Sequence, residues 1–221
     1  MEQRKIKNIL WDWNGTLLDD MDLCIECMNT LLKKRSLPEL SQEYYREVFT
    51  FPVKDYFINI GFDFSNEPFE VPADEFVLLY NRKFHQAALY NNARKSLGNF
   101  KKKGYRQFIL SAQEQKLLHR LLDHYNIREY FEAATGTTDN YAHSKVEAGL
   151  IMMEQLALNP RETIMIGDTI HDYEVATALG VSCLLISHGH QSPTRLRSTG
   201  ATVLEDYPEI SGHLTNHHSD N

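Results

Sequence analysis

Five functional groups follow or flank the apolar runs of this 221-residue chain. Asp12 ends the run in KNILWD, Ser111 follows YRQFIL, Thr135 follows YFEAA, and Asp168 ends TIMIGD. Lys145 opens the helical pattern that precedes the last of these runs. Because ligands of open parallel sheets bind outside the carboxyl ends of the strands, we expect these groups to converge at one edge of a sheet.

The carboxylates among them predict a metal site. Asp168 and Asp172, in GDTIHD, are four residues apart, one at a strand tip and the other in the first helical turn. Both can therefore face one ion. Carboxylates brought together repel one another unless a cation joins them, and hard oxygen ligands of this charge suit Mg²⁺.

The lysine predicts a second ligand at the same place. An ammonium beside a metal-binding carboxylate cluster indicates a clamp for a phosphoryl group, whose charge the two cations share. Ser111 and the backbone N–H groups that follow it, at a helix N-terminus, can hold the remaining phosphate oxygens. Asp12 is then a candidate nucleophile that forms an aspartyl-phosphate.

Alternating strand and helix patterns after residue 104 predict a parallel, doubly wound sheet, since parallel neighbours need crossover connections. Strands are expected over residues 6–13, 105–111, 130–135, 163–168, 181–187 and 201–205. Between the first two strands, residues 20–34, 39–49, 53–60 and 73–89 carry helical patterns, and 63–72 reads as a loop. We predict a Rossmann-like α/β core (residues 1–16 and 96–221) interrupted by an all-helical insertion (17–95), with a frayed polar tail from residue 212.

Composition argues against several classes of protein. The formal charge is −7, and the basic residues are dispersed apart from 101–103, whereas a nucleic-acid surface needs clustered cations. No apolar run approaches the ~20 residues that span a bilayer, and the N-terminus lacks the apolar stretch of a secretory signal. Three cysteines are too few for a disulfide framework, so we expect a reduced, cytoplasmic protein.

The cysteines and histidines of the chain could be taken for metal ligands, but their positions predict other roles. Cys24 and Cys27 form a lone C-x-x-C, but they lie on a helical pattern and predict ordinary helix packing. The histidines lack strong ligand spacing and predict a solvated surface; the candidates are His188, His190, His217 and His218.

The segments DWNGTLLDD, ILS at Ser111, Lys145 and GDTIHD together resemble the four ordered motifs of the haloacid dehalogenase-like hydrolase superfamily. The inserted helices resemble the α-helical cap of its phosphoglycolate phosphatase and β-phosphoglucomutase relatives. The resemblance covers nearly the whole chain. It implies that Asp12 is the nucleophile and a metal ligand. It also implies that phosphate is bound by Ser111, by the backbone of Ala112 and by the side chain of Lys145, which is a catalytic residue as well.

The resemblance also implies roles for the remaining motif positions. Asp168 matches a metal ligand, and Asp172 supports the ion directly or through water. Position 14 matches the general acid/base, and its backbone carbonyl matches a Mg²⁺ ligand. Most phosphatases of the family have an aspartate at this position, but this chain has Asn14.

Asn14 puts the second half of the catalytic cycle in question. An amide has no proton to give at neutral pH and takes none from water, and the missing acid/base catalysis is worth roughly 10²–10⁴ in rate. Three explanations compete: a natural enzyme whose leaving group needs no acid, a weakly active or binding-only descendant, and an engineered trap for the intermediate. We favour a natural residue, because asparagine suits the Asn-Gly turn.

The function that the resemblance implies is Mg²⁺-dependent hydrolysis of a small phosphorylated metabolite in the cytoplasm, in the manner of phosphoglycolate phosphatase. The expected protein is a monomer or homodimer without a nucleic-acid or membrane partner. The alternatives are a low-activity or non-catalytic phosphate-binding or regulatory protein and a phosphomutase. A dehalogenase is disfavoured, since that branch lacks the Mg²⁺ requirement. Polar residues of the insertion are the candidates for substrate choice: Arg46, Lys54 and Arg82.

Overall fold

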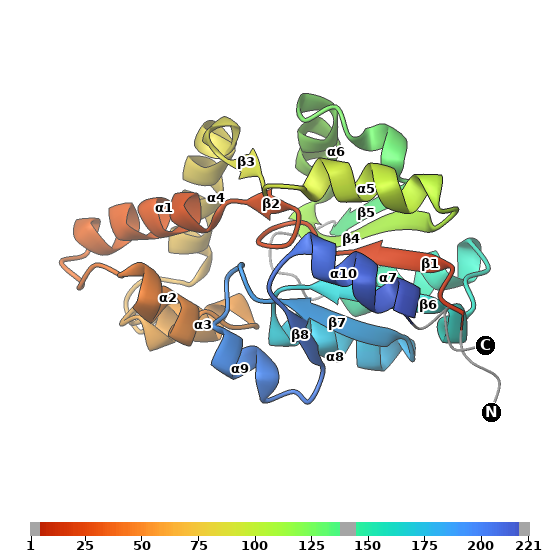
Figure 1. Ribbon diagram of the computed structural model, residues 1–221. Helices are drawn as coiled ribbons and strands as arrows, with labels where there is room; N and C mark the ends of the chain where they lie inside the picture. The colour runs from red at the N-terminus through yellow and green to blue at the C-terminus, as the bar shows by residue number, and fades with distance from the viewer. Residues whose placement is uncertain (1–4, 138–144, 217–221) are drawn as a thin grey trace.

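A six-stranded parallel sheet forms the centre of the molecule (Figure 1). The computed structural model describes residues 5–137 and 145–216. In spatial order the strands are β5 (Ala133–Thr137), β4 (Arg106–Glu114), β1 (Asn8–Trp11), β6 (Thr163–Gly167), β7 (Ser182–Ile186) and β8 (Thr202–Leu204). The first strand of the chain therefore lies between β4 and β6 and pairs with both in parallel.

Helices cover both faces of this sheet, as the near-continuous apolar strands require. Ile9 and Trp11 of β1 belong to the core on one face, and Leu10 belongs to the core on the other. The first face is covered by α5 (Ala93–Lys102), α6 (Gln115–His124) and α10 (Tyr207–Asn216); the second is covered by α7 (Lys145–Gln155) and α8 (Ile170–Leu179). The predicted fold class, a Rossmann-like parallel sheet with inserted helices, is confirmed.

The inserted helices lie to one side of the sheet (Figure 1). They are α1 (Met21–Lys34), α2 (Gln42–Val48), α3 (Val53–Asn59) and α4 (Glu70–Lys83), and they surround an apolar core of their own that includes Met28, Leu32 and Phe57. Their two connections to the sheet pair as an antiparallel ribbon, β2 (Leu18–Asp19) with β3 (Ala88–Leu89). Strands of two residues are too short to show an alternation of apolar and polar residues, so the sequence did not predict this ribbon.

Polar contacts also join α2 to the segment that follows β7. The guanidinium Nη2 of Arg46 donates to the backbone carbonyls of Ser187 and of Gln191, the latter at 3.0 Å. In the opposite direction, Gln191 Nε2 and Arg195 Nη1 donate to the carbonyl of Phe49 at 2.9 and 2.7 Å. We call these contacts the latch, because they connect the inserted helices to the sheet through side chains and backbone carbonyls and not through the chain itself.

Four local expectations were wrong. Strand β4 continues to Glu114, so Ser111 lies within a strand and the next helix begins only at Gln115. Thr135 lies inside β5 instead of ending it. Helix α4 begins at Glu70, within the expected loop. The tail does not fray at residue 212, because α10 continues to residue 216 and Leu214 is buried.

The remaining short elements are α9 (Pro193–Arg197) and the 3₁₀ turns η1 (Phe84–Gln86), η2 (Arg128–Tyr130) and η3 (Pro160–Glu162). Cys24 and Cys27 both lie on α1, where Cys27 is buried in the apolar core and Cys24 packs against it, as predicted. Across the described residues, no helix combines the length and apolar character that crossing a membrane requires.

Candidate active site

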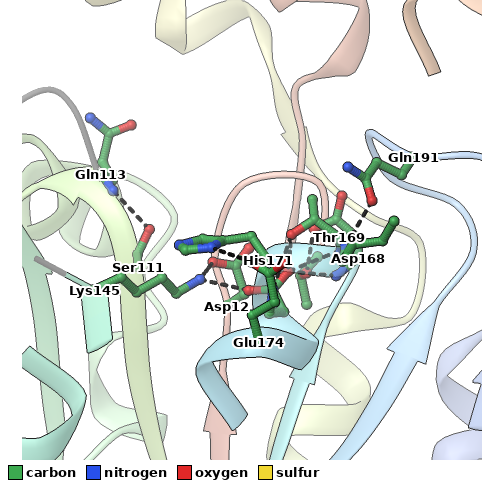
Figure 2. A network of polar contacts seen from close by, with 12 residues as sticks. Asp12, Ser111, Gln113, Lys145, Asp168, Thr169, His171, Glu174 and Gln191 are labelled. Carbon is green, nitrogen blue, oxygen red and sulfur yellow. Dashed lines mark hydrogen bonds and ion pairs between the residues drawn. The ribbon is translucent and has the colours of Figure 1, made fainter. Parts of the chain in front are cut away.

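Three carboxylates converge at the carboxyl edge of the central strands (Figure 2). Asp12 directly follows β1, Asp168 directly follows β6, and Asp172 lies in the first turn of α8. Their oxygens lie within 4.8 Å of one another, and each residue is at most 6% exposed. The edge that the sequence predicted is therefore the place where these groups meet.

Lys145 supplies the positive charge at this edge. Its Nζ donates to Asp12 Oδ1 at 2.5 Å and to Asp172 Oδ1 at 2.6 Å, and the residue is 2% exposed. Figure 2 shows the side chain extending toward Asp12. A single ammonium thus lies between the candidate nucleophile and the helical carboxylate.

Burial controls the protonation of this cluster. Burial, together with the charges of Asp172 and Asp168, raises the pKa of Asp12 to about 8, and Lys145 offsets only part of that rise. Burial likewise raises the pKa of Asp168 to about 6. Burial opposes ionisation of Asp172 too, but Lys145 and Thr169 outweigh it and hold that pKa below its ordinary value. The pKa values of adjacent carboxylates are thus pushed apart.

The charge balance of the cluster fits a divalent cation. Three buried carboxylates face one lysine, so full ionisation leaves net negative charge in a region of low dielectric. Oxygen donors alone make up the set, which is the chemistry that Mg²⁺ prefers. The donors present therefore fit the predicted ion.

Backbone geometry fixes the orientation of Asp168. Its Oδ1 accepts a hydrogen bond from Thr16 Oγ1 at 2.9 Å, and its Oδ2 accepts one from the backbone N–H of His190 at 2.7 Å. Gly15 has φ +71°, and a Cβ on it would lie 2.3 Å from Asp168 Oδ2. Only glycine accommodates both the left-handed backbone and this close approach.

Asp172 is held by the start of its own helix. The N-cap residue Thr169 and Asp172 form a reciprocal capping box, in which Thr169 N–H and Oγ1 donate to Asp172 Oδ2 at 3.0 and 2.7 Å. The Asp168 N–H donates to the same oxygen at 3.2 Å. Since Oδ1 binds Lys145, both oxygens of Asp172 already have partners within the protein.

Asn14 is held by the carboxylate of Asp20, which has no motif or spacing that predicts such a role. Its Nδ2 donates to Asp20 Oδ2 at 2.7 Å and to the Tyr80 hydroxyl at 2.9 Å, and that hydroxyl donates to the same carboxylate oxygen. Two acceptors around one amide atom identify it as the nitrogen. The acceptor Oδ1 is therefore left for the cavity that Asn14 lines.

His190 is part of the same network, so the expectation of a solvated histidine was wrong. It is 3% exposed, its Nε2 lies 3.3 Å from Asp20 Oδ1, and its Nδ1 lies 2.8 Å from the Tyr45 hydroxyl. Burial opposes its protonation, but Asp20, Asp168 and Asp12 outweigh burial and raise the pKa of His190 to about 9. A histidine in a loop has no periodicity that could have signalled this burial.

The other three candidate histidines differ among themselves. His188 is half-buried, and its ring lies 3.8 Å from that of Tyr90, centroid to centroid. His217 and His218 lie outside the described residues.

The predicted phosphate-binding segment borders the same cavity. Ser111 is 1% exposed, and its Oγ accepts the N–H of Gln113 at 3.1 Å (Figure 2). Ala112 also lines the cavity, and its carbonyl accepts the Thr137 hydroxyl at 2.9 Å. The segment is extended strand and α6 begins only at Gln115, although Glu114 and Lys116 at the start of that helix also line the cavity.

The cavity has a volume of about 500 Å³ and lies between the sheet edge and the inserted helices. Asp12, Ser111 and Lys145 line one end, and side chains of the insertion line the other. Its lining includes none of the three polar residues suggested for substrate choice. Arg46 belongs to the latch, and Lys54 lies over the ring of Phe64.

The sheet order, the inserted helices and the charged strand ends define a Rossmann-like α/β protein whose ligand edge is covered by a helical segment. A family model for haloacid dehalogenase-like hydrolases matches residues 9–186. The chain belongs to this family.

Individual relatives are distant. Tyrosine-protein kinase PtkA of Mycobacterium tuberculosis is 22% identical over 202 residues, which cover 89% of this chain and 67% of that protein. Phosphoglycolate phosphatase of Nitrosococcus oceani is 24% identical over 216 residues, covering 94% and 96%. A solved haloacid dehalogenase-like hydrolase from Streptococcus pneumoniae has a TM-score of 0.82 at 20% identity, covering 95% and 98%. At the level of the family, the predicted enzyme class, a phosphoric monoester hydrolase, is confirmed.

Proposed function

We propose that this chain hydrolyses a small phosphate monoester through an aspartyl-phosphate on Asp12. The observation that carries the proposal is the placement of Asp12, which lines the cavity beside Lys145 and two further buried carboxylates. A carboxylate nucleophile splits a difficult displacement into two easier steps. We also propose that residues 17–95 act as the cap and that 1–16 and 96–221 form the core.

The first step transfers the phosphoryl group to the protein. An oxygen of Asp12 attacks phosphorus, a new O–P bond forms, and the bond from phosphorus to the leaving oxygen breaks. Lys145, the Ser111 hydroxyl and the backbone N–H of Ala112 hold the phosphoryl oxygens and offset the charge that develops on them. In the second step, water attacks the phosphorus of the intermediate and returns Asp12 as a carboxylate.

Mg²⁺ fits this site as the cofactor. Asp12, Asp168 and the backbone carbonyl of Asn14 would hold it. Asp172, whose Oδ1 binds the Lys145 ammonium and whose Oδ2 belongs to the capping box of α8, would support it indirectly. When bound, the ion supplies positive charge that balances the carboxylates and the phosphoryl oxygens.

Asn14 shapes the cycle because its amide transfers no proton. The leaving oxygen must depart without a proton from this position, and the attacking water can be oriented by Asn14 Oδ1 but not deprotonated by it. The same residue supports the second candidate function, a phosphate-binding protein with little turnover.

The decisive test is phosphate release from a panel of monoesters, with and without Mg²⁺, by the parent and by Asp12→Asn. We expect release that requires Mg²⁺ and is abolished in the variant, because an amide at this position is no nucleophile. Asp123→Asn, which alters an exposed carboxylate on α6, is the matched control and should retain parental activity. Turnover by Asp12→Asn within tenfold of the parent would remove Asp12 from the mechanism.

The same panel separates the alternatives. A phosphomutase would convert a sugar phosphate into its isomer with little release of phosphate. A binding-only protein would release none and would still bind phosphate analogues.

A further inference from the structure

The wall of the cavity opposite Asp12 consists largely of aromatic rings from the inserted helices and the loops between them. They include Phe49, Phe51, Tyr56, Phe57, Phe69 and Phe76. All of these rings except Phe76 contact a neighbour edge to face; for example, the Tyr56 ring lies 5.3 Å from that of Phe49 and 5.8 Å from that of Phe57, between centroids. The wall is therefore a packed aromatic surface that presents ring faces and edges to a ligand.

The charges around the cavity are unevenly distributed. Within the described residues, the part of the lining contributed by the insertion contains no lysine or arginine, and its carboxylate, Asp20, is already bound by Asn14, Tyr80 and His190. Lys145 binds Asp12, and the other lysine of the lining is the exposed Lys116 on α6. His190, the other buried group of the lining that carries positive charge, lies beside Asp20. A substrate with a carboxylate next to its phosphate, such as 2-phosphoglycolate, would therefore lose water there without gaining a buried cation that lacks a carboxylate partner.

One polar atom interrupts the aromatic wall. Tyr56 is 3% exposed and lines the cavity, and its hydroxyl has no hydrogen-bond partner among the described residues. A buried hydroxyl without a partner costs free energy, which a ligand recovers by bonding to it. The ring contacts hold this hydroxyl in place, so it can select a polar substituent at one position of a bound ring.

The chemistry at Asn14 favours the same class of substrate by an independent route. Without a general acid at that position, esters whose leaving group is a stable anion react most readily. A phenolate is such a group, whereas an alkoxide is strongly basic. The aromatic wall and the missing acid thus both favour a phosphate ester of a phenol.

We propose that the substrate is a small aryl phosphate, whose ring packs against the aromatic wall and whose polar substituent binds the Tyr56 hydroxyl. This inference rests on the proposed function. In the reaction, Asp12 forms an O–P bond, the P–O(aryl) bond breaks, and the phenolate leaves with the electron pair and takes a proton from water.

Binding of non-reactive analogues with Mg²⁺ tests the wall without any need for turnover. Benzylphosphonate and 4-hydroxybenzylphosphonate replace the ester oxygen of an aryl phosphate by a methylene group, and 3-phosphonopropionate does the same for phosphoglycolate. We expect both benzyl compounds to bind at least tenfold more tightly than 3-phosphonopropionate by calorimetry. Equal or tighter binding of 3-phosphonopropionate would overturn the proposal.

Variants locate the bound ring. Tyr56→Phe should remove the preference for 4-hydroxybenzylphosphonate over benzylphosphonate and leave the affinity for benzylphosphonate within twofold. Phe51→Leu, at a half-buried ring, should weaken both benzyl compounds severalfold and leave 3-phosphonopropionate unchanged. Tyr44→Phe, on the same insertion but 47% exposed, is the control and should change none of these affinities. A preference retained in Tyr56→Phe would exclude its hydroxyl as the specificity group.

Turnover separates this proposal from the proposed function. The substrates are phenyl, benzyl and acetyl phosphate and 2-phosphoglycolate, which combine the presence or absence of a ring with a good or poor leaving group. The two esters with a ring should have KM values at least tenfold lower than those of the other two substrates, and phenyl phosphate should have the highest kcat/KM. Preferred hydrolysis of 2-phosphoglycolate would refute the aryl substrate and leave the phosphatase in place. Tight benzylphosphonate binding without hydrolysis of any of the four would refute the phosphatase and support the aryl ligand.

Discussion

At the scale of single residues, the main feature of the site is where its carboxylates lie. Position 14 carries an amide, and a buried carboxylate at position 20 binds that amide directly. Asp20 also accepts the Gly15 N–H at 3.0 Å and lies beside His190, and the bonds from its neighbours hold its pKa below the ordinary value despite burial. Asp20 therefore positions Asn14 as a neutral acceptor, and the loop is built around an amide.

Substitution of Asn14 by aspartate tests whether the amide limits turnover. Asn14→Asp should raise kcat on benzyl phosphate, an alkyl ester, by roughly 10²–10⁴, the usual size of acid/base catalysis, and should raise it less on phenyl phosphate. The new carboxylate faces Asp20, so the melting temperature should fall, and the additional change Asp20→Asn should restore it. A variant no faster on either ester would show that another group supplies the proton.

Asp168 and Asp172 should differ in their effect on the metal. Asp168→Ala is expected to weaken activation by Mg²⁺ much more than Asp172→Ala. Asp168 lies at the strand tip and its oxygens accept only from a hydroxyl and a backbone N–H, whereas Asp172 Oδ1 binds the Lys145 ammonium. Removal of Asp172 should instead lower the melting temperature, since it breaks the capping box of α8. Titration of Mg²⁺ against the activity of each variant measures the difference. Equal loss in both would mean that the two carboxylates share the ion evenly.

At the scale of elements, the inserted helices connect to the sheet in two different ways. The ribbon formed by β2 and β3 carries both chain connections, and the latch joins α2 to residues 187–195 through side chains and backbone carbonyls. A pair of two-residue strands leaves a short covalent base about which helices can turn, and the latch can open without loss of secondary structure. We therefore expect the insertion to move as a unit over the sheet edge.

Hydrogen exchange measures this movement. Amides of residues 15–20 and 90–96 should exchange more slowly when a phosphate analogue and Mg²⁺ bind, because closure excludes water from the ribbon and the cavity. Arg46→Ala should accelerate exchange in the same segments by opening the latch, whereas Lys54→Ala, outside the latch, should not. Unchanged exchange in both segments on ligand binding would indicate a fixed cap.

At the scale of the whole molecule, the sequence predicted those features that depend on hydrophobic periodicity or on the positions of residues along the chain. Continuous apolar runs predicted the strands, and the positions of Asp12, Asp168 and Lys145 beside those runs predicted that they meet at one edge. The burial of His190 and the bond from Asn14 to Asp20 depend on contacts between segments distant in the chain or within one turn. Neither kind of contact leaves a periodic pattern in the sequence. The burial of His190, the hydrogen bond from Asn14 to Asp20 and the aromatic wall could therefore be found only in the three-dimensional structure.

The buried charges also make stability depend on pH. The pKa of Asp12 rises from 3.8 to about 8, so the folded state holds a proton that the unfolded chain has lost, and stability falls as pH rises toward 8. The pKa of His190 rises from 6.5 to about 9, so the stability contributed by its protonation is complete below pH 6.5 and is lost as pH passes 9. Both effects have the same sign between pH 6.5 and 9.

With metal removed by a chelator, we therefore expect the melting temperature to fall between pH 6.5 and 9, by about 2–4 °C for each 1 kcal/mol lost. His190→Gln should make this fall shallower, because it removes one of the two titrating groups. Mg²⁺ binds the ionised form of Asp12, so it should raise the melting temperature more at pH 9 than at pH 6.5. His124→Gln, at an exposed histidine of α6, is the matched histidine control and should leave the slope unchanged. A melting temperature that is flat across this range, or an equal effect of Mg²⁺ at both pH values, would show that Asp12 and His190 do not carry their protons into the folded state.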